Sequence, residues 1–105
     1  MSGRAVAIIM ICAAAPPVHA GTIAESEALT IVQRHCVMCH AMRPKHESFQ
    51  EAPKNISLET VADLRRYAAA IYAQTVQSRA MPLGNQTGMS DDERNTLGRW
   101  VKELQ

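Results

Sequence analysis

Apolar residues recur at helical spacing in three stretches of the chain. In the first stretch, Ala28, Ile31, Val32 and His35 fall at positions i, i+3, i+4 and i+7, which places them on one side of a helix. We expect this helix to run from about Ala24 to Cys36 and to bury that side. An ordinary core helix shows the same pattern, so the stripe indicates architecture and not chemistry.

The second stretch is a longer helical segment from about Leu58 to Arg79. Ser57 is a suitable N-cap for it, because a serine hydroxyl accepts a hydrogen bond from a free amide of the first helical turn. A bend near residues 68–70 would divide the segment into two helices. The residues expected on its inner side are Val61, Leu64, Ala68, Ile71, Tyr72, Thr75 and Val76.

The third stretch predicts a helix at the end of the chain. Ser90 and Glu93 have the spacing of a capping box, in which each side chain binds the other residue's backbone amide. The apolar residues that follow at helical spacing are Leu97, Trp100, Val101 and Leu104. This stripe needs a partner, and the first helix is the expected one.

The segments between these helices are predicted to be loops. Residues 41–55 show no sustained periodicity and contain Pro44 and Pro53, and the stretch from 79 to 89 contains one proline and two glycines. The expected fold class is therefore all-α, with about four helices.

The first 20 residues have the three-part layout of a secretory signal peptide. Arg4 supplies the charge, an apolar run extends from Ala5 to Ala15, and the small residue Ala20 ends the segment. We predict cleavage after Ala20, export to the periplasm, and one small domain over residues 21–105. No segment of this domain approaches the roughly 20 apolar residues of a membrane span.

The stretch with the clearest chemistry is Cys36-Val37-Met38-Cys39-His40, which follows the first predicted helix. A C-x-x-C-H sequence is typical of covalent attachment of haem c. In such a site Cys36 and Cys39 bond to the porphyrin, and His40 binds the iron on the proximal side. The other ring N–H of such a histidine normally donates to a carbonyl. A carbonyl near Pro44 is one candidate, and the sequence does not locate the group.

Three other interpretations of the cysteine pair carry less weight. A thioredoxin-like redox pair requires a flanking strand and crossover, and no strand pattern lies nearby. A structural zinc site requires four ligands, whereas only His35, His40 and His46 accompany the two cysteines. A disulfide across so short a loop would be strained, and it would leave His40 without a role.

A second iron ligand is expected from the loop before the last helix. A thioether sulfur is a soft ligand that suits haem iron, and histidine–methionine ligation raises the reduction potential. Met81, immediately before Pro82, is the predicted sixth ligand, with Met89 as the alternative. Met38 and Met42 lie too close to His40 in the sequence to reach the opposite side of the iron.

Composition bears on the stability of the core, and charge bears on the possible partners. The chain has one Trp, one Phe and two Tyr, so a core of this size would be marginal without a covalently held, largely apolar haem. Its 11 Lys and Arg residues balance 10 Asp and Glu residues. This balance argues against nucleic acid or any other strongly charged partner.

With the attachment motif, the Met81-Pro82 pair and the terminal helix in place, residues 21–105 resemble class I cytochrome c along nearly their whole length. The resemblance implies a small all-α fold around one haem, in which the first and last helices cross. Ala28 occupies the position where that family usually has glycine, and a small residue is thus kept. Val32 stands where the family usually has an aromatic residue, which is lost here.

The region from Thr75 to Trp100, including Ser78-Arg79-Ala80-Met81-Pro82 and Gly84-Asn85-Gln86-Thr87-Gly88-Met89, is similar to the C-terminal cytochrome domain of membrane-bound, cytochrome-fused urate oxidases. The multi-span membrane domain of that family has no counterpart in this sequence. The resemblance therefore implies an electron-accepting part whose redox partner is a membrane oxidase or dehydrogenase.

The function expected from these observations is single-electron transfer by one haem c between exported or membrane-bound redox partners. Two alternatives remain open. The chain is either a detached subunit of a membrane oxidase or dehydrogenase complex, or a haem sensor or peroxidase in which Met81 does not bind. Only the last would be an enzyme or sensor with an open sixth position.

Overall fold

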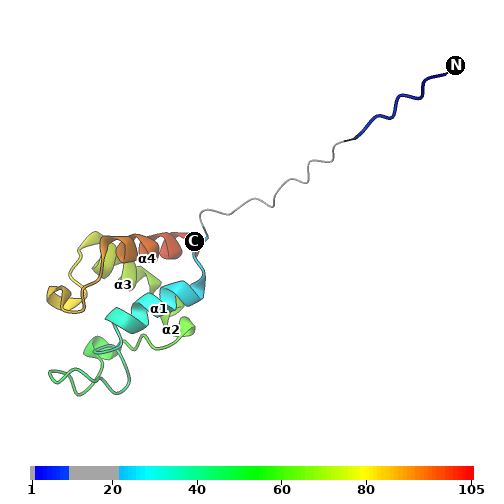
Figure 1. Ribbon diagram of the computed structural model, residues 1–105. Coiled ribbons are helices and arrows are strands. Elements are labelled where there is room, and N and C mark those ends of the chain that lie inside the picture. Colours follow the sequence, from blue (N-terminus) through cyan, green and yellow to red (C-terminus); the bar gives the residue numbers. More distant parts are fainter. Residues whose placement is uncertain (1, 10–21) are drawn as a thin grey trace.

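The computed structural model describes residues 2–9 and 22–105 of the chain (Figure 1). These residues contain the α-helices α1 (Glu25–His35), α2 (Val61–Arg66), α3 (Ala68–Tyr72) and α4 (Asp91–Glu103), and they contain no strand. The all-α prediction is therefore confirmed for this part of the chain. Most of the predicted signal peptide, and its cleavage point after Ala20, lie outside the described residues.

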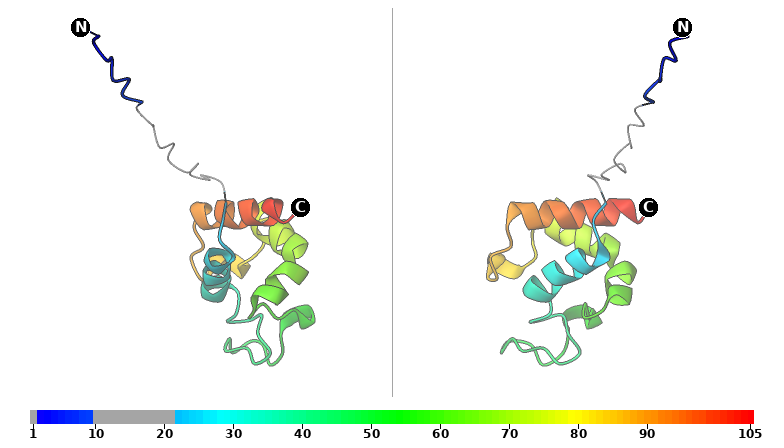
Figure 2. Two further views of the ribbon diagram at one scale, coloured as in Figure 1. Left: turned by 90° about the vertical axis from the view of Figure 1, so that its right-hand side faces the viewer. Right: turned by 45° about the vertical axis from the view of Figure 1, so that its right-hand side comes forward.

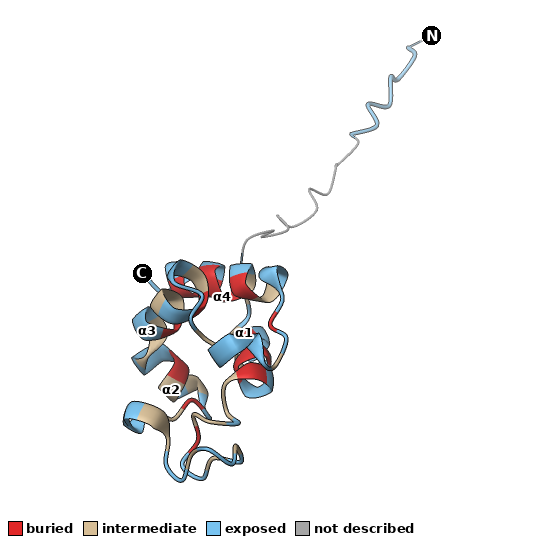
Figure 3. Ribbon diagram, turned by 90° about the vertical axis from the view of Figure 1, so that its left-hand side faces the viewer, coloured by how far each residue is buried: buried red, intermediate tan, exposed pale blue. Residues whose placement is uncertain are grey.

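Helices α1 and α4 pack against each other, and α3 lies alongside α4 (Figure 2). The predicted stripe of α1 is buried, with Ala28 and Val32 fully inaccessible to solvent. On α4, Leu97 and Trp100 are buried as well, and Figure 3 shows buried residues on both helices. The contact between the first and last helices, which the two apolar stripes predict, is therefore confirmed.

The start of α4 agrees with its sequence signal, and its end does not. Ser90 and Glu93 form the predicted capping box, with the Glu93 amide donating to Ser90 Oγ over 3.1 Å. Leu104, however, lies beyond the last helical residue and is 43% exposed. Its predicted place in the buried stripe is wrong, because the helix ends at Glu103 before that position turns inward.

The middle helical segment is divided at Tyr67, whose backbone (φ −106°, ψ 18°) leaves the helical range between α2 and α3. The break is one residue before the predicted bend. The predicted cap is wrong: Thr60, and not Ser57, begins α2. The Asp63 amide donates to Thr60 Oγ1, and the Thr60 amide donates to Asp63 Oδ2.

Because Thr60 caps α2, we expect Thr60→Ala to lower the free energy of unfolding by about 1 kcal/mol. Ser57→Ala is the matched control, since the Ser57 hydroxyl donates only to the exposed Glu59 carboxylate. Urea denaturation of both variants measures the difference. Equal losses at the two positions would contradict the assignment of the cap.

The chain after α3 continues as a π-helical turn, Ala73–Gln77, which packs beneath α4. Gly98 of α4 allows this close approach, because a Cβ atom there would lie 3.3 Å from Val76 Cγ2. The π-helical turn leads into the loop that carries Met81. Because this turn contacts α4, it fixes where the Met81 loop begins relative to α4.

Residues 41–55 are irregular, as predicted, apart from a short 3₁₀ turn at Pro53–Asn55. Within the described ranges, no helix is both long enough and apolar enough to cross a membrane.

Candidate functional site

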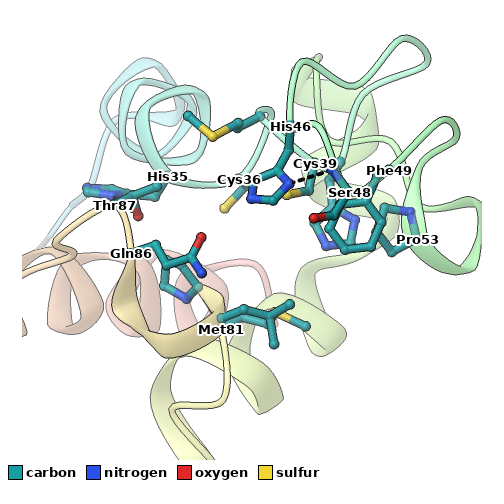
Figure 4. Close-up of a pocket in the computed structure, with 14 residues that line it drawn as sticks. His35, Cys36, Cys39, His46, Ser48, Phe49, Pro53, Met81, Gln86 and Thr87 are labelled. Carbon is teal, nitrogen blue, oxygen red and sulfur yellow. Dashed lines mark hydrogen bonds between the residues drawn. The ribbon is translucent and has the colours of Figure 1, made fainter.

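The cysteine–histidine motif continues the last turn of α1. The Cys36 amide donates to the Val32 carbonyl over 2.8 Å, as it would in a helix. The amides of Cys39 and His40 then both donate to the Cys36 carbonyl, over 3.2 and 2.8 Å. The motif is thereby folded into one compact turn at the end of α1. Figure 4 shows Cys36 and Cys39 close together at this turn.

Both cysteines are free thiols, and their surroundings keep them protonated. Burial raises the pKa of Cys36 to about 12, with a further contribution from the neighbouring Cys39, and burial also raises the pKa of Cys39. A redox-active C-x-x-C pair requires the opposite shift, toward a reactive thiolate. This environment gives no support to the thioredoxin-like interpretation.

A zinc site at this pair finds no support among residues 2–9 and 22–105. In these ranges no group of three or more His, Cys, Asp or Glu side chains is placed to hold a metal ion. His46, one of the three histidines considered above, stacks at an angle against Phe49, with 5.5 Å between the ring centroids.

The His40 ring is held by a backbone carbonyl. Its Nδ1 atom lies 2.9 Å from the Ile56 oxygen. Because a carbonyl can only accept, Nδ1 is the donor in this contact, and in the neutral ring Nε2 is then the nitrogen with the free lone pair. The partner is therefore Ile56 and not the candidate carbonyl near Pro44. After the 41–55 loop the chain passes beside the motif again, and the Leu58 amide donates to the His40 carbonyl over 2.9 Å.

Two adjoining cavities open beside this ring, with volumes of about 310 and 250 Å³. Together they fall inside the range of about 300–1,000 Å³ that ligand pockets cover. Cys36, His40 and Met81 line both of them. The two cavities are therefore two sides of one space, which we call the central cavity.

The walls of the central cavity come from four parts of the chain. The first side is completed by residues of the 46–53 loop and the 82–87 loop, among them His46, Phe49, Pro53, Pro82, Leu83 and Thr87. The second side is completed mainly by residues between Ile56 and the π-helical turn, among them Ile56, Leu58, Tyr67, Ala70, Ile71 and Gln74. The space is bounded mostly by carbon atoms, which suits an apolar ligand.

The two candidate methionines lie in different places. Met81 is half-buried at the wall of the central cavity, and Figure 4 shows it across the space from Cys36 and Cys39. Met89 is only 3% exposed, belongs to the hydrophobic core, and lines neither side of the cavity. The geometry therefore favours Met81 as the thioether ligand.

A buried polar cluster beside the cavity is absent from the sequence prediction, which treats His35 as part of an apolar stripe. His35 is 5% exposed. Its Nδ1 lies 2.9 Å from Thr87 Oγ1, and its Nε2 lies 2.7 Å from Glu93 Oε2. The available signal was the polarity of His35 itself, since a buried imidazole needs partners.

Glu93 connects this cluster to the start of α4. Burial tends to raise the pKa of its carboxyl, but hydrogen bonds from Ser90 and from His35 outweigh that effect and lower the pKa below its ordinary value. Arg34 also approaches the same carboxylate, at 3.2 Å. The carboxylate form is thus favoured by the folded state.

From this shift we expect Glu93→Gln to destabilise the protein most at neutral pH. A carboxyl whose pKa is lower in the folded state stabilises the fold above its unfolded pKa of about 4.3, and that contribution disappears as the pH falls through the folded value. The difference in unfolding free energy between wild type and variant should therefore shrink below about pH 4.3. Urea denaturation across pH measures it, and a difference that is constant with pH would contradict this role.

Comparison with protein-family models, with curated proteins and with solved structures finds no match. The described residues define an all-α protein in which two free thiols, an oriented imidazole and a thioether surround one central cavity. The proposed function rests on these side chains and on the cavity between them.

Proposed function

We propose that the chain is a mono-haem c-type cytochrome of class I that transfers single electrons. Cys36 and Cys39 would hold the haem covalently, and His40 and Met81 would be the axial ligands of its iron. The observation that supports this proposal is the His40–Ile56 hydrogen bond, because it selects the tautomer of the neutral ring in which Nε2 can bind iron, at the wall of a cavity that Met81 shares.

The residues present fit such a group. Thioether formation requires two unpaired thiols on a short turn, and Cys36 and Cys39 meet that requirement. A thioether and a neutral imidazole are the donor set typical of cytochromes c. When bound, haem supplies a one-electron iron couple whose potential rises with histidine–methionine ligation.

In this function the residues of the chain would orient the His40 ring and enclose the iron site. The Ile56 carbonyl fixes the orientation of the His40 ring and raises its basicity. Met81, which lines the same cavity, would supply the second iron ligand and leave no position for an external ligand. Phe49, Leu58 and Ile71 line the cavity with apolar side chains, and such a shell limits solvent access to a bound group and tunes its reduction potential.

The proposed partners are redox proteins, in particular a membrane oxidase or dehydrogenase. Met38 and Leu83 line the first side of the cavity and are 46% and 52% exposed. Exposed apolar side chains at the opening of a site favour contact with another protein. We also propose that the protein is exported and works outside the cytoplasm, either alone or docked to such a membrane subunit.

Ligand binding to the holoprotein tests the carrier against the alternative of a sensor or peroxidase. Absorption spectra of the ferric protein with cyanide, and of the ferrous protein with CO, should change little on mixing because both axial positions are filled. Rapid binding of either ligand to the native protein would reject the carrier and favour the open-site alternative.

A further inference from the structure

Arg94 is a buried arginine whose hydrogen bonds, among the described residues, go to carbonyl and amide oxygens and not to a carboxylate. It lies in the first turns of α4 and is 5% exposed. Its Nη1 donates to the Thr75 carbonyl over 2.8 Å and to the Met81 carbonyl over 2.9 Å. Its Nη2 lies 3.5 Å from Asn85 Oδ1, and its Nε has no partner.

This arrangement is costly for stability alone. A charged side chain is rarely buried without an opposite charge, and a buried donor without a partner adds a further penalty. An apolar residue of similar size at a buried position is often as stable as a charged one. Because stability alone does not account for a buried guanidinium here, its role lies with the Thr75 and Met81 carbonyls that it binds.

The guanidinium completes a clamp on the backbone of Met81. On one side, the Met81 amide donates to the Gln74 carbonyl in the π-helical turn, over 3.0 Å. On the other side, the Met81 carbonyl accepts from Arg94, which binds Thr75 with the same nitrogen. Met81 is thus tied to the π-helical turn directly and to α4 through Arg94.

The clamp extends into the rest of the loop through Asn85. The Asn85 side chain accepts from the Met89 amide over 2.9 Å and donates to the Met89 carbonyl over 3.3 Å. Met89 is in turn anchored in the core. The chain from Met81 to Met89 is therefore fixed at both ends, and Arg94 contacts it at Met81 and at Asn85.

We infer that Arg94 is a positioning residue that holds the Met81 backbone so that its thioether is presented to the haem iron. This inference rests on the proposed function. An external ligand can bind the iron only after Met81 is displaced. The affinity for such a ligand therefore measures how strongly the clamp holds Met81 at the iron.

The test is cyanide titration of the ferric holoprotein in wild type, Arg94→Lys and Arg94→Leu. Lysine keeps the charge but has no planar guanidinium, so it cannot place one nitrogen on the Thr75 and Met81 carbonyls and a second nitrogen beside Asn85. Leucine removes the charge and all of these donors. Loss of a charged hydrogen bond should make cyanide bind about 10- to 100-fold more tightly in both variants. The thioether-to-iron charge-transfer absorption should weaken in parallel. Arg65→Lys is the control, because Arg65 pairs with Glu25 at the exposed surface, and its cyanide affinity should match wild type.

Stability measured on the same samples separates positioning from a purely structural role. If Arg94→Lys lowers the unfolding free energy while cyanide affinity and the charge-transfer absorption stay at wild-type values, the inference is overturned. Should Arg94→Leu fail to fold, Arg94→Lys decides the question. Failure of the proposed function gives a different result: Met81→Ala would then bind cyanide as wild type does, which overturns both proposals.

Discussion

Replacing Met81 with alanine is expected to lower the reduction potential and to open the iron to CO. The thioether favours the ferrous state relative to nitrogen or oxygen ligands, so its loss stabilises the ferric state. Axial ligands span about 0.8 V in haem proteins, and we expect a decrease on the order of 0.1 V or more. Spectroelectrochemical titration measures the potential, and CO binding to the ferrous variant measures the opened position.

Met89→Ala is the matched control for this experiment. Met89 is 3% exposed in the core, so its truncation should cost about 2–5 kcal/mol of stability through the cavity that it leaves. The potential and the closed iron should remain. The reverse pattern, in which Met89→Ala opens the iron and Met81→Ala does not, would show that Met89 is the ligand.

Replacing both Cys36 and Cys39 with alanine is expected to abolish covalent haem attachment. Any haem that the variant still binds through His40 and Met81 should be extracted by acidified organic solvent. We also expect the double variant to lose cooperative unfolding once the haem is removed, because a domain of this size has little apolar core without it. Far-UV circular dichroism during thermal unfolding measures this loss. Solvent-resistant haem in the double variant would contradict the assigned attachment.

The helices were largely predictable from the sequence because their signals are local. The stripe of α1 and the capping box of α4 each involve residues within two turns, and both predictions are confirmed. The cap of α2 was not predictable in the same way. Ser57 and Thr60 both have a suitable side chain, and only the path of the chain out of the 41–55 loop decides which of them begins the helix.

The contacts that shape the site could not be predicted, because they join residues far apart in the sequence. The His40 ring finds its carbonyl 16 residues later, at Ile56. His35 finds Glu93 58 residues later. The burial of Arg94 could have been predicted, because it lies three positions before Leu97 on the buried side of α4. Its hydrogen-bond partners could not, because they depend on where the Met81 loop packs against α4.

The preference for Met81 over Met89 shows how sequence and structure combine. The sequence supplies two methionines on one loop, and the prediction of Met81 rests on its place before Pro82. The structure adds a physical separation, with one side chain at the cavity wall and the other in the core. Ligation of iron by Met81 stays a prediction that the alanine variants decide.

The central claim is that Cys36 and Cys39 carry one covalently bound haem, and the mass of the denatured protein tests it most directly. The full chain, with the predicted leader of residues 1–20, would be expressed in cells that attach haem to exported cytochromes, alongside a control cytochrome. We predict the mass of residues 21–105 plus one haem, retained after denaturation. The mass of the bare polypeptide, in cells that load the control cytochrome fully, would contradict the account.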